Sequence, residues 1–156
     1  MTVQNAVGDI NISGSNNTIT QTKGSNDVSI KGDLNTYTST LGQKELEVFG
    51  NGNSITTGAE SDRVKISGDS NTFESIGGDN RIEVTGDSNQ IQGGAGIDNI
   101  TLKGDSNTAL GGEGNDKFVL GSGNGNTIDG EAGSKNTMIN YAENTVYTNA
   151  LDVTPQ

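Results

Sequence analysis

Apolar residues recur along most of this chain with a period of 18 residues, and each period holds one isolated apolar position followed by an apolar pair. Counting a glycine as place 1, successive coils open at Gly14, Gly32, Gly50, Gly68, Gly86, Gly104 and, after one added residue, Gly123. Place 6 is apolar or aromatic in all seven: Ile19, Tyr37, Ile55, Phe73, Ile91, Ala109 and Ile128. Places 15 and 17 form the pair: Val28/Ile30, Leu46/Val48, Val64/Ile66, Ile82/Val84, Ile100/Leu102, Phe118/Leu120 and, weakened, Thr137/Ile139. A register kept this long predicts a repeat fold before any local element is assigned.

The alternation within each coil predicts two short strands. Places 14–18 alternate polar and apolar, so we expect a strand with places 15 and 17 inward. Places 5–7 give a shorter strand with place 6 inward, and the Gly, Asn, Asp and Ser residues between the strands are typical of turns. The pattern therefore predicts an all-β, single-domain parallel β-roll or β-helix solenoid of about seven 18-residue coils, with two short strands and two turns per coil. With strands about 4.8 Å apart, seven coils would extend roughly 35 Å.

A triangular helix of hexapeptides also uses 18 residues per coil, but it needs an apolar residue at every sixth place. Places 12 and 18 are mostly polar, so we reject that fold.

The repeats span residues 14–140. Residues 1–13 are predicted to form an N-terminal entry strand or cap, because residues 9–13 match residues 27–31 of the first coil. Residues 141–156 leave the register and are predicted to form a C-terminal cap or tail, since the end of a solenoid must be shielded.

Two adjacent coils carry one glycine-rich nonapeptide motif. Gly-Gly-x-Gly-x-Asp-x-apolar-x occurs at 93–101 and again at 111–119, so that Asp98 and Asp116 are 18 residues apart. Glycine permits positive φ, which can direct backbone carbonyl oxygens into a turn, and the aspartate adds a carboxylate. Two stacked carboxylates would repel each other unless a cation lies between them, and Ca²⁺ prefers six to eight oxygen ligands. The motif therefore indicates a calcium site, with a turn of solvated carboxylates as the alternative.

This motif resembles the nonapeptide repeats of the RTX proteins, whose parallel β-rolls bind Ca²⁺ in their turns. The resemblance implies that the metal-binding residues are Gly93, Gly94, Gly96, Asp98, Gly111, Gly112, Gly114 and Asp116. It also implies a secreted bacterial protein without an N-terminal signal peptide, whose roll folds outside the cell when calcium binds. Lys44 and Lys135 fall at the Asp place in coils two and seven, where an ammonium would fill or expel the cation. We therefore expect a short row of ions beside coils three to six.

The turn on the other side of each coil has a different pattern, Gly-Asp-Ser-Asn in three coils. Asp69, Asp87 and Asp105 are expected to form a column, and we favour solvated carboxylates over a second file of cations because the glycine spacing differs. The asparagine at place 4 is predicted to stack as an amide ladder that satisfies buried backbone groups. Its members are Asn17, Asn35, Asn53, Asn71, Asn89, Asn107 and Asn126.

Composition narrows the classes of function. A net charge of −11 with 28% hydrophobic residues would suggest disorder in a chain without repeats, but stacked coils need fewer large residues. The acidic balance argues against nucleic acid and anionic membranes, and no apolar run is long enough for a membrane span. The chain has no His and no Cys, which removes the usual general base, the usual zinc ligand and thiol chemistry.

These observations favour a non-enzymatic module stabilised by calcium. A module that binds a polysaccharide, a cell-surface partner or ice is the alternative, as is an accessory module of a polysaccharide-modifying enzyme. Thr18, Thr36 and Ser54 begin outward pairs of hydroxyls on the first three coils, but Glu74 breaks the row, which favours an ordinary solvent-facing strand surface. An enzyme is the least favoured class, because no departure from the repeat marks a catalytic cluster.

Overall fold

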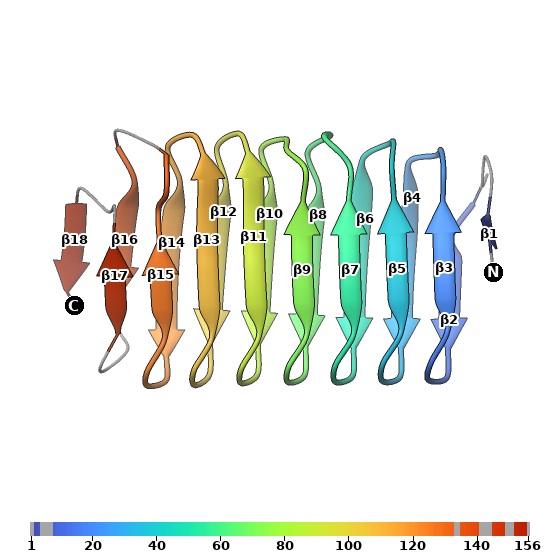
Figure 1. Cartoon of the computed structure of the whole chain (residues 1–156), viewed down its shortest axis with the longest axis horizontal. Helices are drawn as coiled ribbons and strands as arrows, with labels where there is room; N and C mark the ends of the chain where they lie inside the picture. The colour runs from blue at the N-terminus through green and yellow to red at the C-terminus, as the bar shows by residue number, and fades with distance from the viewer. Residues whose placement is uncertain (1, 4–7, 133–134, 141–144, 149–151, 156) are drawn as a thin grey trace.

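The computed structural model describes residues 2–3, 8–132, 135–140, 145–148 and 152–155. Within these residues the regular secondary structure consists of β-strands, with no helix. Successive strands alternate between two parallel sheets of nine strands each, which lie face to face along the molecule (Figure 1). The two termini lie at opposite ends of its long axis (Figure 1). The predicted all-β parallel solenoid of about seven 18-residue coils is confirmed. Two sheets, and not three, also confirm that the chain is not a triangular helix.

We name the two sheets by their strand numbers. The odd sheet contains β1 (Thr2–Val3), β3 (Thr18–Gln21), β5 (Thr36–Ser39), β7 (Ser54–Thr57), β9 (Thr72–Ser75), β11 (Gln90–Ala95), β13 (Thr108–Glu113), β15 (Thr127–Asp129) and β17 (Val146–Thr148). The even sheet contains β2 (Ile10–Ser13), β4 (Asn26–Lys31), β6 (Lys44–Phe49), β8 (Arg63–Ser67), β10 (Arg81–Thr85), β12 (Asn99–Lys103), β14 (Lys117–Ser122), β16 (Thr137–Asn140) and β18 (Asp152–Pro155).

Each strand pairs with the strand one coil away in a register that stacks equivalent places. Ile82, for example, lies between Val64 and Ile100. The apolar residues of places 6, 15 and 17 therefore form rows inside the solenoid, with Tyr37, Phe73 and Phe118 as their largest members. In coil seven the predicted inward pair Thr137/Ile139 is wrong, because an added residue puts Met138 inside, opposite Phe118. Outward places alternate with them, as in β8. Stacking identical places is what lets a chain with so few large residues bury a core.

The two ends extend this pattern. β2 pairs with β4 with Ile10 opposite Val28, which agrees with the sequence match between these segments. β17 and β18 each add one strand to a sheet. The predicted caps at 1–13 and 141–156 fall partly on residues 1, 4–7, 141–144, 149–151 and 156, which lie outside the described residues, and they stay predictions.

Two kinds of turn connect the sheets. The Asn turn leads from each even strand to the next odd strand, and here the backbone N–H of each place-4 asparagine donates to Oδ1 of its counterpart one coil on. The six bonds run from Asn17 to Asn126 at 2.8–2.9 Å, which confirms the predicted amide ladder. The motif turn leads from each odd strand to the next even strand and carries the glycine-rich motif.

Candidate metal centre

A second ladder runs through the motif turns at place 13. The backbone N–H of each residue donates to Oδ1 of the residue one coil on, at 2.7–2.9 Å. Its members are Lys44, Asp62, Asn80, Asp98, Asp116 and Asn136. Asp98 and Asp116 are therefore vertical neighbours, as predicted. One oxygen of each motif aspartate thus has a structural role that an asparagine fills equally well.

The second oxygen of each motif aspartate has no such role. Asp98 and Asp116 are both 0% exposed, and Oδ2 of each is buried without a hydrogen-bond donor among the described residues. Oδ2 of Asp98 lies directly against Gly93, because a Cβ on that glycine would overlap it and would also lie 2.6 Å from the carbonyl oxygen of Gly111. Gly111 has the same relation to Asp116. Acceptor oxygens therefore converge around each Oδ2, and no donor among the described residues forms a hydrogen bond with it.

Asn80 shows what an uncharged residue does at the same place. Its Nδ2 donates to the carbonyl oxygens of Gly78 at 2.9 Å and Gly93 at 3.1 Å, and to Oγ of Ser75 at 3.2 Å. A donor at this point of the turn therefore finds several carbonyl acceptors. Replacing that donor with a carboxylate oxygen, as at Asp98, puts negative charge among acceptors.

Lys44 shows what a cation does there. Its side chain is almost fully buried, and Nζ donates to the carbonyl oxygens of Gly24, Leu41 at 3.0 Å and Gly42 at 2.6 Å. These carbonyls belong to the motif turns of two successive coils, so one ammonium joins coil to coil. The Lys44 ammonium therefore lies inside its turn, among the carbonyl oxygens. Glycine-turn carbonyls in this fold can hold positive charge.

The residue at place 8 explains why coils five and six differ from the earlier ones. Place 8 is buried throughout the first six coils and faces the place-13 column. It holds Gln21, Ser39, Thr57, Ser75, Gly93 and Gly111. The first four carry a hydroxyl or amide that can serve the turn. The two glycines carry none, and their missing side chains leave the space into which Oδ2 of Asp98 and Oδ2 of Asp116 point.

The other motif glycines are required by the backbone. Gly94, Gly96, Gly112 and Gly114 have φ between +94° and +133°, and a Cβ at Gly96 would lie 2.6 Å from the carbonyl oxygen of Gly78. All eight residues predicted from the sequence therefore lie together in two stacked segments, which comprise the ends of β11 and β13 and the turns that follow them.

Burial disfavours the ionised form of both carboxyl groups, Asp98 and Asp116, unless a positive charge lies beside them. Burial raises the pKa of Asp98 to about 6, and the charges of Asp116 and Asp79 add to the rise, while hydrogen bonds from Asn80 oppose it. Burial also raises the pKa of Asp116, with a contribution from Glu131. A proton or a cation at this place relieves the same electrostatic cost.

Asp62 lies in the same column but in different surroundings. Burial raises its pKa, while the Thr57 hydroxyl and the amide and charge of Lys44 lower it. Asn80 separates Asp62 from Asp98, so only Asp98 and Asp116 are adjacent carboxylates in the column. The predicted row of ions beside coils three to six is therefore best supported beside coils five and six.

One residue was assigned wrongly from the sequence. Lys135 was placed at the Asp position of coil seven, but Asn136 accepts the bond from Asp116, and Lys135 is exposed, with its N–H bonded to Oδ1 of Asn115. One added residue before Gly123 and a second one between Asn126 and Asn136 give the ladder a spacing of 20 from Asp116. No lysine therefore closes the column above Asp116.

The donor set of the two turns suits a hard cation. Nowhere in the described ranges do three or more His, Cys, Asp or Glu side chains gather as a metal group, so two carboxylates would need backbone carbonyl oxygens to complete a coordination shell. Calcium accepts such mixed oxygen ligands and irregular geometry. The residues present therefore fit Ca²⁺.

The Asn turns hold a different column of carboxylates. Asp69, Asp87 and Asp105 are stacked as predicted, and Oδ1 of each accepts the N–H of the next residue in the column at 2.7–2.8 Å. Asn51 makes the same bond one coil before Asp69. Unlike Asp98, these side chains lie in the exposed part of the turn, where water can solvate the second oxygen.

Comparison with known proteins does not identify a family or a function for this chain. No family model, curated protein or solved structure matches this chain. The structure describes no helix that could span a membrane in any of the residues it covers.

Proposed function

We propose that this chain is a non-enzymatic, calcium-binding β-roll module of a secreted bacterial protein, stabilised by Ca²⁺ in the motif turns of coils five and six. The observation that supports the proposal is the pair of buried Oδ2 atoms of Asp98 and Asp116, which lie without a donor in turns built from glycine carbonyls. Bound calcium would supply the positive charge that Lys44 supplies in coil two.

Secretion follows as part of the same proposal. The site joins two coils and has no counterpart in an extended chain, so the free energy of calcium binding adds to the free energy of folding. A net charge of −11 also opposes compaction until cations neutralise part of it. A chain of this kind stays open where calcium is scarce and folds where calcium is plentiful, which suits a protein that must be exported before it folds.

The decisive experiment compares thermal unfolding with calcium and with a chelator, followed by circular dichroism. At a calcium concentration about 100 times Kd, the melting temperature of the wild-type chain should rise by roughly 5–10 °C. In Asp98→Asn/Asp116→Asn that rise should vanish. The variant should nevertheless fold, because Asn80 shows that asparagine keeps the ladder bond and donates to the turn carbonyls.

A matched control removes the same charge from the other side of the coils. Asp87→Asn/Asp105→Asn keeps the ladder bonds of the Asn turn, as Asn51 does naturally, and should keep the full calcium response. The proposal fails if the motif-turn variant responds to calcium as strongly as the control.

A further inference from the structure

The outward surface of the even sheet is divided by charge. On β8, β10, β12 and β14 the outward residues include five cations and one carboxylate, Glu83. The cations, which we call the basic face, are Arg63, Lys65, Arg81, Lys103 and Lys117, and all five are exposed. These are five of the nine Lys and Arg residues in a chain whose net charge is −11. The basic face therefore carries local positive charge on a molecule whose overall charge is negative.

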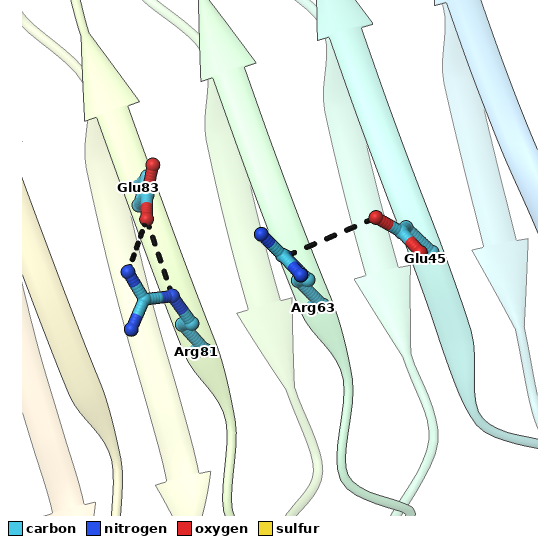
Figure 2. Close-up of polar contacts among 4 residues, drawn as sticks. All are labelled: Glu45, Arg63, Arg81 and Glu83. Carbon is cyan, nitrogen blue, oxygen red and sulfur yellow. Dashed lines mark hydrogen bonds and ion pairs between the residues drawn. The ribbon is translucent and has the colours of Figure 1, made fainter.

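The same sheet is acidic toward the N-terminus. β4 and β6 present Asp27, Glu45 and Glu47 outward, with Lys31 as the cation. Figure 2 shows the boundary, where Nε of Arg63 lies 3.8 Å from Glu45. The side chains of this pair are 67% and 58% exposed, so water screens the contact and Arg63 keeps most of its capacity to bind an anion.

Arg81 uses one edge of its guanidinium within the molecule. Its Nη2 lies 2.6 Å from Glu83 on the same strand, and Nε donates to the same oxygen (Figure 2). Glu83 thereby fixes the orientation of Arg81. A shallow depression lies where side chains from β6, β8 and β10 meet, and it is lined by Arg63, Lys65 and Arg81 together with the carboxylates of Glu45, Glu47 and Glu83.

The basic face is large enough to act independently of the rest of the molecule. Four strands about 4.8 Å apart span about 14 Å, whereas the Debye length at physiological ionic strength is about 8 Å. A ligand lying on these strands is therefore governed by the cations beneath it. Carboxylates farther away than this are screened, whereas Glu45 and Glu47 on the adjacent strand β6 still act on Arg63 and Lys65.

The geometry of the face points to a linear ligand with regularly repeated anions. Arg63, Arg81 and Lys117 lie in one column of the sheet, which Asn99 interrupts, and Lys65 and Lys103 lie in the next two outward columns. The outward Thr85, Asn99 and Thr101 lie between these cations with hydrogen-bonding groups. We propose that the basic face binds a linear acidic polysaccharide, carrying carboxylate or sulfate groups, laid across the strands along the solenoid axis. The site lies on the outer surface of the even sheet, away from the motif turns, but β12 and β14 belong to coils five and six, so its integrity rests on the proposed calcium binding.

Other polyanions fit this face less well. Single-stranded nucleic acid is bound through aromatic side chains that stack on bases, and none of the outward residues of β8, β10, β12 or β14 is aromatic. An anionic membrane surface would favour apolar side chains that insert beside the cations, but the outward positions of β8, β10 and β12 are polar or charged.

The test measures the affinity of the folded chain, in excess calcium, for short oligogalacturonates, dextran sulfate and uncharged dextran. Lys65→Gln/Lys103→Gln/Lys117→Gln should bind both acidic sugars at least tenfold more weakly than wild type, because each cation near an anionic partner contributes on the order of a fivefold gain in affinity. The matched variant Lys23→Gln/Lys31→Gln/Lys135→Gln loses the same charge outside the basic face and should bind like wild type. Binding should weaken as salt is added, and dextran should not bind.

Circular dichroism of both variants shows whether each remains folded, which is expected because all six lysines are exposed. Equal losses in the two variants would overturn the proposal, as would a wild-type chain that binds neither acidic sugar. Tighter binding of a single-stranded oligonucleotide would identify the wrong class of partner. A wild-type dimer that the basic-face variant alone dissociates would mean that the acidic half of a second copy covers the face.

Discussion

A single atom separates Asp98 from Asn80 in the motif-turn ladder. Both residues accept the backbone N–H of the preceding coil through Oδ1, so the ladder bond does not require a charge. Asn80 then turns Nδ2 toward the carbonyl oxygens of the turn, while Asp98 presents Oδ2. Leaving a buried acceptor unsatisfied costs on the order of 1–3 kcal/mol. Aspartate at this place therefore stabilises the fold only when its Oδ2 binds a proton or a cation.

The first prediction is a reversed pH dependence of the calcium-free protein. Burial raises the pKa of Asp98 to about 6, so between its ordinary value and 6 the folded state holds more protons than the unfolded state. The stabilising contribution is therefore complete at low pH and is lost as pH rises through 6. Lowering the pH from 7.5 to 4.5 should raise the free energy of unfolding by about 2 kcal/mol through Asp98 alone. Urea unfolding at a series of pH values measures this.

Asp98→Asn is the control for that measurement, since the variant has no proton to bind at this place and its stability should vary less with pH. Saturating calcium should also flatten the wild-type profile above pH 6, because the ion replaces the proton. A calcium-free wild type that becomes steadily less stable below pH 7 would contradict the assignment.

At the scale of single elements, the motif turns are closed in three different ways. The Lys44 ammonium donates to the carbonyls of the turn before β6, and the Asn80 amide does so in the turn before β10. In the turns before β12 and β14 a buried carboxylate oxygen takes the place of that donor. Because Lys44 binds carbonyls from two successive coils, coils one and two are joined without any metal.

Lys44→Met tests this closure. Methionine fills similar space but cannot donate, so the carbonyl oxygens of Gly24, Leu41 and Gly42 lose their shared donor. We expect a loss of about 2–4 kcal/mol of stability, equal with and without calcium, in chemical unfolding experiments. Lys31→Met serves as the control, because that lysine is exposed on the outer surface of β4 and its replacement should change stability little. A calcium-dependent loss in Lys44→Met would refute a metal-free role.

The register of the strands was predictable because apolar residues repeat at fixed places, and the pairing of Ile82 with Val64 and Ile100 follows from that spacing alone. The same spacing placed Asp98 over Asp116. It failed at Lys135, because coil seven has a second added residue between Asn126 and the ladder position, so that Asn136 and not Lys135 enters the ladder. The equivalence of the two ladders was visible in the nine-residue spacing of Asn89, Asp98, Asn107 and Asp116.

The burial of the second carboxylate oxygen could not be predicted from the sequence. Spacing assigns a residue to a coil and a side of the sheet, but the direction of Oδ2 depends on the space left by Gly93, one strand earlier in the same coil. The contrast between glycine at place 8 in coils five and six and Thr57 or Ser75 in coils three and four became meaningful only once the structure placed these residues against the place-13 column.

For the whole molecule, the proposed calcium binding would divide the solenoid into a metal-independent part and a calcium-dependent part. Each coil contacts its neighbours alone, so the stability of a solenoid is close to a sum over adjacent pairs of coils. Lys44 secures the early coils, whereas the buried carboxylates weaken coils five and six in the absence of a cation. Removal of calcium should therefore open the molecule locally before it unfolds as a whole.

Hydrogen exchange measured by mass spectrometry tests whether coils five and six open before the early coils. On addition of a chelator, amides of β11–β14 should lose protection by about a hundredfold, corresponding to the roughly 2.7 kcal/mol that calcium contributes at 100 times its Kd. Amides of β4 and β6 should keep nearly all of theirs, because the ammonium that joins their coils is covalently part of the chain. In Asp98→Asn/Asp116→Asn the chelator should change neither region. Equal loss of protection in β4–β6 and β11–β14 would show instead that the coils open as one unit, and that calcium acts on the whole solenoid and not on two of its turns.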